Sequence, residues 1–340
     1  MFGLGWLRAL TDARGLLEHA HHGVPRLGEG YTTDDNARAL LYLSLLPEGA
    51  RDEGLVRTYL AFLLHMQKED GRFRNGLTLD GRFEDEGEAE DPTGRAVLAL
   101  AAAQRLPPPY AGPAREALLR ALPALEGFTS LRGRAYALLG LLALPKEPFL
   151  EAAEALGEGL LRAFREAEPA WPYPGPLTYA NHRPVEALYA YGLAFRRQEA
   201  VALARRALAF LKEHYFTPGE EGLFFDPVGN RFMARGRDKP LFDQQPIEAK
   251  CALLAHLRFG ERVLAEVAFL WFHGRNRLRA PRVDAFGPMA GLSPHGPNQN
   301  RGAEALLAYL LAWQALVQGV FPQVDEGVAL GRVFALGGRP

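Results

Sequence analysis

The sequence contains little cysteine or methionine and has no excess of charge of either sign. Its single cysteine, Cys251, excludes a disulfide framework and a zinc site made from several cysteines. A lone cysteine is typical of a reducing compartment. The net charge of −1 gives no attraction for nucleic acid or an anionic membrane surface. We therefore expect a cytoplasmic protein that binds neither nucleic acid nor membrane.

Long hydrophobic runs are also missing. The first residues lack an apolar core long enough for a signal peptide before Asp12 and Arg14. The most apolar late segment, 303–321, carries Glu304, Gln314 and Gln318, which indicates a packed helix rather than a membrane span. Arginine outnumbers lysine and proline is frequent, a composition compatible with a thermophile.

Six short stretches repeat one pattern, in which a polar cluster leads to Arg-Ala or Glu-Ala and then to an apolar helical stretch. They lie at 33–39, 90–96, 129–135, 181–187, 243–249 and 299–305. A period near 50 residues accommodates two helices and two connections, which predicts a repeated supersecondary unit. Six helical hairpins that close into a ring would place all six polar clusters at one end.

Apolar residues at three- and four-residue spacing predict the helices themselves. They cover 37–46, 55–66, 94–105, 114–125, 133–144, 151–166, 185–195, 200–214, 247–257, 261–272 and 303–317, and a weaker twelfth covers 4–19. No linker divides the chain, so we expect one all-α domain over 1–340, with 320–340 as an appended C-terminal tail.

Long connections at 68–89, 167–181, 217–242 and 273–298 all precede a polar cluster. Loops of this length in a compact domain are usually functional or disordered. They contain short strand-like pieces, and 222–226 followed by a turn at 228–230 predicts a β-hairpin.

Each polar cluster has two interpretations. One side chain suffices to cap a helix N-terminus, but several clusters supply two to four. In a closed ring the second cluster, with Glu90 and Asp91, would face the fifth, with Asp243. Facing carboxylates suit glycoside hydrolysis, in which one donates a proton and the other activates water.

The residue before each shared alanine is charged. It is an arginine in the first three clusters and a glutamate in the last three, which predicts ion pairs between neighbouring inner helices. These residues are Arg38, Arg95, Arg134, Glu186, Glu248 and Glu304.

Seven segments together resemble a bacterial family of six-hairpin glycosidase-like proteins, often labelled glycosidase-related or glycosyltransferase-associated. They are GYTTDDNARA (30–39), GRFRN (71–75), EDPTGRA (90–96), LTYAN (177–181), FDQQP (242–246), WFHGRN (271–276) and NQNRGAE (298–304). The resemblance runs from about residue 11 to 313. It implies an (α/α)6 toroid with a carbohydrate-active site at the polar end. The fourth junction departs from the family pattern, because Tyr179-Ala-Asn-His-Arg183 lacks the expected aspartate.

The leading hypothesis is a glycoside hydrolase, favoured as inverting, that needs neither metal nor cofactor. Its catalytic candidates are Asp91 and Asp243, with Asp35 next. Aromatic rings suit the apolar faces of sugars, and amide, acidic and basic groups suit their hydroxyls. The substrate-binding candidates are Tyr31, Asp34, Asn36, Arg74, Glu90, Trp171, Tyr179, His182, Arg183, Gln244, Gln245, Arg275, Asn276 and Asn300.

Three alternatives compete with it. A sugar epimerase or isomerase on the same toroid would use a histidine, for which His182, His273 and His295 are candidates. A non-catalytic carbohydrate-binding protein would use the same cavity without turnover. Terpenoid chemistry at Asp34 and Asp35 fails because position 38 is arginine. The sequence leaves the sugar and the oligomeric state open.

Overall fold

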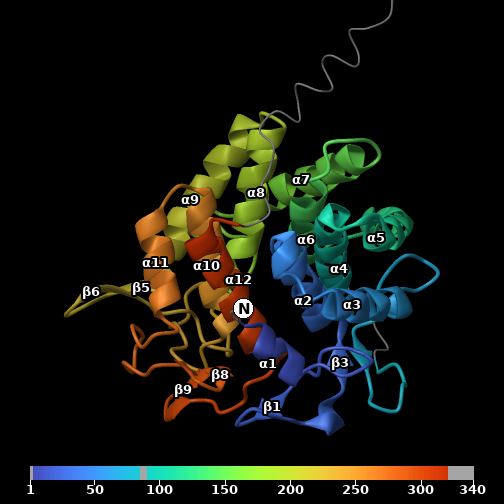
Figure 1. Ribbon diagram of the computed structural model, residues 1–340. Helices are drawn as coiled ribbons and strands as arrows, with labels where there is room; N and C mark the ends of the chain where they lie inside the picture. The colour runs from blue at the N-terminus through green and yellow to red at the C-terminus, as the bar shows by residue number, and fades with distance from the viewer. Residues whose placement is uncertain (1–2, 85–89, 321–340) are drawn as a thin grey trace, which may run out of the picture.

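The computed structural model describes residues 3–84 and 90–320. Six inner helices surround a common centre, and each contacts the next, with α12 against α2 closing the ring (Figure 1). The inner helices are α2 (Thr33–Leu45), α4 (Glu90–Ala102), α6 (Leu131–Leu141), α8 (His182–Ala194), α10 (Pro246–Arg258) and α12 (Ala303–Gln318). They are buried on nearly all sides, as expected of a helix enclosed by others.

An outer helix covers each inner helix. The outer set is α3 (Glu53–Met66), α5 (Pro108–Ala121), α7 (Phe149–Glu166), α9 (Gln198–Tyr215) and α11 (Arg262–Leu270), with α1 (Leu4–Ala9). The sixth pair joins the two ends of the described chain, since Trp6 of α1 packs on Tyr309 of α12. The twelve α-helices of the described residues, arranged in six pairs, confirm the all-α toroid predicted from the repeats.

Close backbone approach holds part of the inner ring together. A Cβ atom on Gly94 of α4 would lie 2.4 Å from the carbonyl oxygen of Gly133 in α6. Glycine at 94 therefore lets these two helices pack closer than any side chain would allow.

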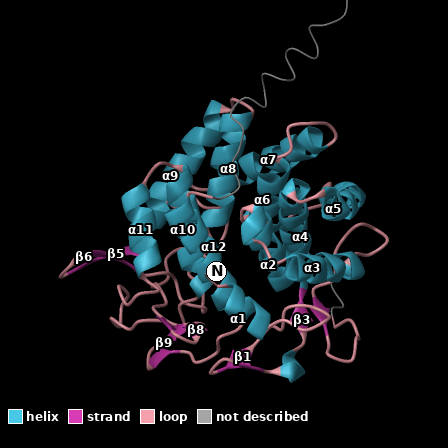
Figure 2. Ribbon diagram, viewed as in Figure 1, coloured by secondary structure: helices cyan, strands magenta, loops and turns pink. Residues whose placement is uncertain are grey.

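Within residues 3–84 and 90–320, five short antiparallel strand pairs lie at the end of the ring that carries the long loops (Figure 2). They are β1 (Ala20–His21) with β2 (Val24–Pro25), β3 (Tyr31–Thr32) with β4 (Gly76–Leu77), β5 (Phe216–Gly219) with β6 (Gly222–Phe225), β7 (Val283–Asp284) with β8 (Gly287–Pro288), and β9 (Leu292–Ser293) with β10 (Gly296–Pro297). The predicted strand near 222–226 is confirmed, but its partner is β5, so the turn precedes it rather than following at 228–230.

The predicted first helix is too long. Helix α1 ends at Ala9, and the chain then turns because Asp12 accepts hydrogen bonds from the backbone N–H groups of Arg14 and Gly15. Residues 16–18 continue extended, with Leu17 bonded to Leu10 and Glu18 bonded to Gly30 through the backbone. Within the described residues no helix is long and apolar enough to cross a bilayer. The tail predicted from 320 lies outside the described residues beyond Val320.

Candidate functional site

A cavity of about 350 Å³ opens at the N-terminal end of α2, α10 and α12, a volume within the range of small-molecule sites. Most of the residues that line it are polar. The lining residues are Glu18, His19, Thr32, Asp34, Asp35, Arg38, Asn75, Asn230, Asp243, Gln245, Pro246, Ala290, Gly291, Asn298, Asn300, Gly302, Glu304 and Ala305. Three polar clusters that are far apart in sequence therefore meet here, at the end of the ring where the repeats predicted the site.

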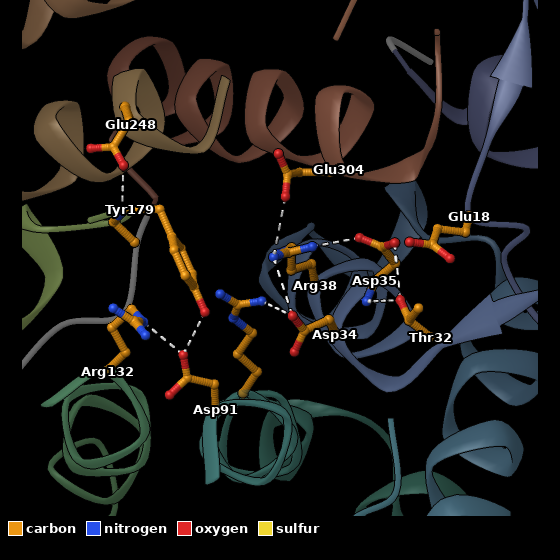
Figure 3. Close-up of polar contacts among 12 residues, drawn as sticks. Glu18, Thr32, Asp34, Asp35, Arg38, Asp91, Arg132, Tyr179, Glu248 and Glu304 are labelled. Atoms are coloured by element: carbon orange, nitrogen blue, oxygen red, sulfur yellow. Dashed lines mark hydrogen bonds and ion pairs between the residues drawn. The ribbon is translucent and has the colours of Figure 1, made fainter. Parts of the chain in front are cut away.

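Five carboxyl groups and one guanidinium line this cavity. Asp34 and Asp35 belong to the first turn of α2, Glu304 to that of α12, and Asp243 precedes α10. The fifth, Glu18, comes from the extended segment before β1. Figure 3 shows the carboxyl groups of Glu18 and Asp35 directed toward one another. This concentration of acidic groups gives the cavity the components of acid–base catalysis.

Glu18 is one of several lining residues that the sequence analysis missed. Burial raises its pKa to about 7, and the neighbouring carboxylates Asp35, Glu29, Asp34 and Glu304 act in the same direction. A large fraction of Glu18 therefore holds its proton at neutral pH, as a general acid requires. The sequence showed only an isolated glutamate in an expected helix, so it held no signal for this role.

His19 lies beside Glu18 with a defined tautomer. The Asn300 carbonyl accepts from the Ala20 backbone N–H at 3.1 Å, so its amide NH₂ faces His19 Nδ1 at 2.9 Å. Nδ1 must then accept, which leaves the proton of the neutral ring on Nε2, 3.5 Å from Glu18 Oε1. Asn300, a predicted binding residue, thus orients a histidine at the cavity wall.

Arginines under the cavity hold the two aspartates of α2. Asp35 is buried, accepts from Thr32 and pairs with Arg38. Burial raises the pKa of Asp35, although the Arg38 guanidinium opposes that shift. Asp34 pairs with Arg95 of α4 and lies 3.7 Å from Arg38. The aspartates are therefore fixed side by side, one deep and one more exposed.

The two leading catalytic candidates do not share this cavity. Asp243 lines it, but Asp91 does not. Asp91 accepts hydrogen bonds from Arg132 at 2.7 Å and Tyr179 at 2.9 Å (Figure 3). It also accepts one from the Ser130 hydroxyl at 2.5 Å. Burial alone would raise its pKa, but Arg132 and Ser130 outweigh burial and lower it. Asp91 therefore keeps its negative charge at neutral pH and is poorly suited to donate a proton.

Of the predicted binding residues, Asp34, Gln245 and Asn300 line the cavity. Others support the fold around it. Glu90 accepts from the backbone N–H groups of Thr129 and Ser130 at the start of α6. Asn36 bonds the Leu16 backbone, Gln244 joins Asp226 to Trp271, and Asn276 bonds two carbonyls of its own loop.

The remaining candidates also lie outside the cavity wall. Their contacts are Tyr31 to Asp12, Arg74 over the Phe83 ring, Trp171 against Phe210, Tyr179 to Asp91, Arg183 to Glu186 and Arg275 to the Glu221 carbonyl. His182 is fully buried among aromatic and histidine rings, with both ring nitrogens unpartnered among the described residues. Burial lowers its pKa far below the usual range.

The ion pairs predicted before the shared alanines are confirmed in part. Arg38 lies 3.9 Å from Glu304, Arg95 pairs with Asp34, and Glu186 pairs with Arg258 at 3.0 Å. The prediction is wrong for two positions. Arg134 bonds backbone carbonyls of Phe128 and Gly159, and the fully buried Glu248 accepts from the Ala180 N–H. Burial raises the pKa of Glu248 to about 8, so it is mostly neutral.

Among the described residues no group of three or more His, Cys, Asp and Glu side chains is arranged to hold a metal ion.

No protein-family model matches the chain, and no curated protein matches it in sequence. Solved structures match it along nearly its whole length. A D-mannose isomerase shares 10% identity with a TM-score of 0.69, covering 94% of this chain and 96% of its own. A cellobiose 2-epimerase from Bacillus thermoamylovorans shares 9% identity with a TM-score of 0.66, covering 91% and 95%. A GH76 α-mannanase from Bacteroides thetaiotaomicron shares 9% identity with a TM-score of 0.60, covering 98% and 95%.

These similar structures are six-hairpin (α/α)6 toroid enzymes, which confirms the fold that the sequence resemblance implied. At identities near 10% the similarity establishes the fold alone, since one fold carries many functions.

Proposed function

We propose that the protein is a carbohydrate-active enzyme, and that it hydrolyses a glycosidic bond in the cavity at the N-terminal end of α2, α10 and α12. The observation that carries the proposal is Glu18, a carboxyl group with a pKa raised to about 7 in a cavity that four other carboxyl groups also line. Glu18 would protonate the leaving oxygen, and Asp243 would activate the water. Asp243 thus keeps the role assigned from the sequence, and Glu18 replaces Asp91.

The rest of the wall supports a neutral sugar as substrate. Amide groups that donate and accept hydrogen bonds suit sugar hydroxyls, and the cavity has these at Asn75, Asn230, Gln245, Asn298 and Asn300. Five carboxyl groups against one arginine would repel a phosphorylated or carboxylated sugar. The similar structures described above are an isomerase, an epimerase and a mannanase, which supports a sugar substrate.

A sugar epimerase or isomerase is the second candidate, and His19 favours it. His19 lines the cavity with its Nε2 proton directed at Glu18, so the pair could move a proton next to a sugar carbonyl. The histidines named from the sequence support this less well, because His182, His273 and His295 do not line the cavity.

A sugar screen with product analysis tests the proposal. We would incubate the protein with mannose- and glucose-based mono- and oligosaccharides in D₂O and follow products by NMR. Hydrolysis supports the first candidate, and the anomer released first distinguishes inversion, the favoured outcome, from retention. Deuterium in an epimerised sugar supports the second. Binding without any product would overturn both in favour of a binding protein.

Variants then connect turnover to the cavity. Glu18→Gln should lower kcat by about 10²–10⁴-fold while sugar binding survives. Glu116→Gln, on the exposed face of α5, should leave kcat unchanged. Loss of turnover in Asp91→Asn, with Glu18→Gln active, would return the catalytic acid to Asp91.

The buried, unpaired Cys251 and the balanced charge also lead us to propose a cytoplasmic location.

A further inference from the structure

A second cavity lies in the centre of the ring, beneath the first. Its volume is about 30 Å³. All six inner helices contribute to its wall, and Arg38 lines both cavities. Leucines make up most of the apolar wall, but four cationic side chains from four different helices also reach it. These are Arg38 of α2, Arg95 of α4, Arg183 of α8 and Lys250 of α10.

Carboxylates neutralise these cations only in part. Arg38 and Arg95 share Asp34, and Arg38 also binds Asp35. Arg183 pairs with Glu186, which Arg258 also contacts. Glu304 lies 3.9 Å from Arg38, but 44% of its side chain is exposed. The four arginines therefore have four carboxylates as partners, and Lys250 has none among the described residues.

Lys250 is the cation without a partner. It is 2% exposed, and no hydrogen bond or ion pair joins its side chain to any other residue that the structure describes. The Nε–H groups of Arg38, Arg95 and Arg183 are buried and have no hydrogen-bond partner in the part of the chain that the structure describes. Burying an unpaired ammonium or N–H donor is costly, because nothing replaces the water that it loses.

We propose that the central cavity binds one small monovalent anion, chloride under ordinary conditions, with Lys250 and the arginine donors around it. The cavity has room for about one particle of the size of a water molecule or slightly larger. It is therefore too small for sulfate, phosphate or a sugar. Burial lowers the pKa of Lys250 to about 7, with Arg183, Arg38 and Arg95 adding to the effect and Cys251 opposing it. An anion would restore the charged ammonium.

Halide-dependent stability tests the proposal. Salt-free protein is titrated with sodium chloride or sodium bromide, with sodium gluconate holding the ionic strength constant. We expect the unfolding temperature to rise with the logarithm of halide concentration, since only the folded state has the site. Equal unfolding temperatures in chloride and gluconate would overturn the proposal.

Two variants place the effect. Lys250→Met should lose the halide response, and should be more stable than the natural protein in gluconate because it no longer buries an unpaired amine. Lys212→Met, on the exposed face of α9, should keep the full response. An unchanged response in Lys250→Met would overturn the proposal. If Lys250→Met does not fold, anomalous diffraction from bromide-soaked crystals of the natural protein decides, with a peak expected next to Lys250 Nζ and refutation if the central cavity has none.

Discussion

Replacing Glu18 by glutamine should make the protein more stable at alkaline pH. The pKa of Glu18 is raised from 4.5 to about 7 in the folded state. Between these values the unfolded chain releases the proton first, so the free energy of unfolding falls as pH rises through this window. Below pH 4.5 both states hold the proton, and the loss is absent. Glutamine cannot ionise, so the variant should not lose this part of the free energy of unfolding as pH rises.

The structure sets the size of the effect. For a fully buried carboxyl group this pKa change would correspond to about 3 kcal/mol. Because 33% of the Glu18 side chain is exposed, solvent screens part of the penalty, and we expect about 1–2 kcal/mol. The free energy of unfolding of Glu18→Gln minus that of the natural protein should therefore be about 1–2 kcal/mol larger above pH 7.5 than at pH 4.5.

Chemical denaturation at a series of pH values measures this. The quantity to follow is the difference in unfolding free energy between the variant and the natural protein, since other titrating groups cancel in it. Glu116→Gln serves as the control and should give a difference independent of pH. A constant difference for Glu18→Gln from pH 4.5 to 8 would refute the raised pKa, and with it the argument for a general acid.

Three further predictions concern the surroundings of the site. Asp91→Asn should lower the free energy of unfolding, measured by chemical denaturation, by about 1–3 kcal/mol, because Arg132, Ser130 and Tyr179 lose a charged acceptor. Unchanged stability would contradict a structural role for Asp91. Gly94→Ala should lower the free energy of unfolding by about 1–3 kcal/mol, since its Cβ would press on the Gly133 carbonyl. The control Gly112→Ala, in α5 with open space around it, should be neutral or stabilising by up to about 1 kcal/mol. Equal effects at the two glycines would show that α4 and α6 can separate. The pKa of His182 is lowered in the fold, so this residue reduces the free energy of unfolding as pH falls through 6.5. In His182→Phe the free energy of unfolding should therefore fall less between pH 7 and 5. An unchanged dependence on pH would show that other groups cause the loss.

Local patterns in the sequence predicted the ring. The three- and four-residue spacing of apolar side chains and the repeated polar-to-helix junctions are properties of adjacent residues, so they can be read without tertiary contacts. They placed all six inner helices correctly and brought the junctions to one end. For this reason Asp34, Asp35, Asp243, Gln245 and Asn300, each at or near a junction, line the cavity as expected.

The roles of individual side chains at these junctions depended on neighbours distant in sequence. Asp91 looked like a free carboxylate, but Arg132 and Tyr179, 41 and 88 residues away, bind it. His182 begins a helix at a polar junction, yet packing against Tyr215 and His256 buries it completely.

Glu18 shows the opposite case. Its place in the cavity follows from extended pairing with Gly30 and from the closing of α12 against α2, and its raised pKa follows from burial and from carboxylates on those elements. The sequence by itself determined which residues form the inner helices and at which end their polar starts gather, because both follow from local periodicity. Only the tertiary structure decided which carboxyl group keeps its proton, because desolvation and charge act through space rather than along the chain.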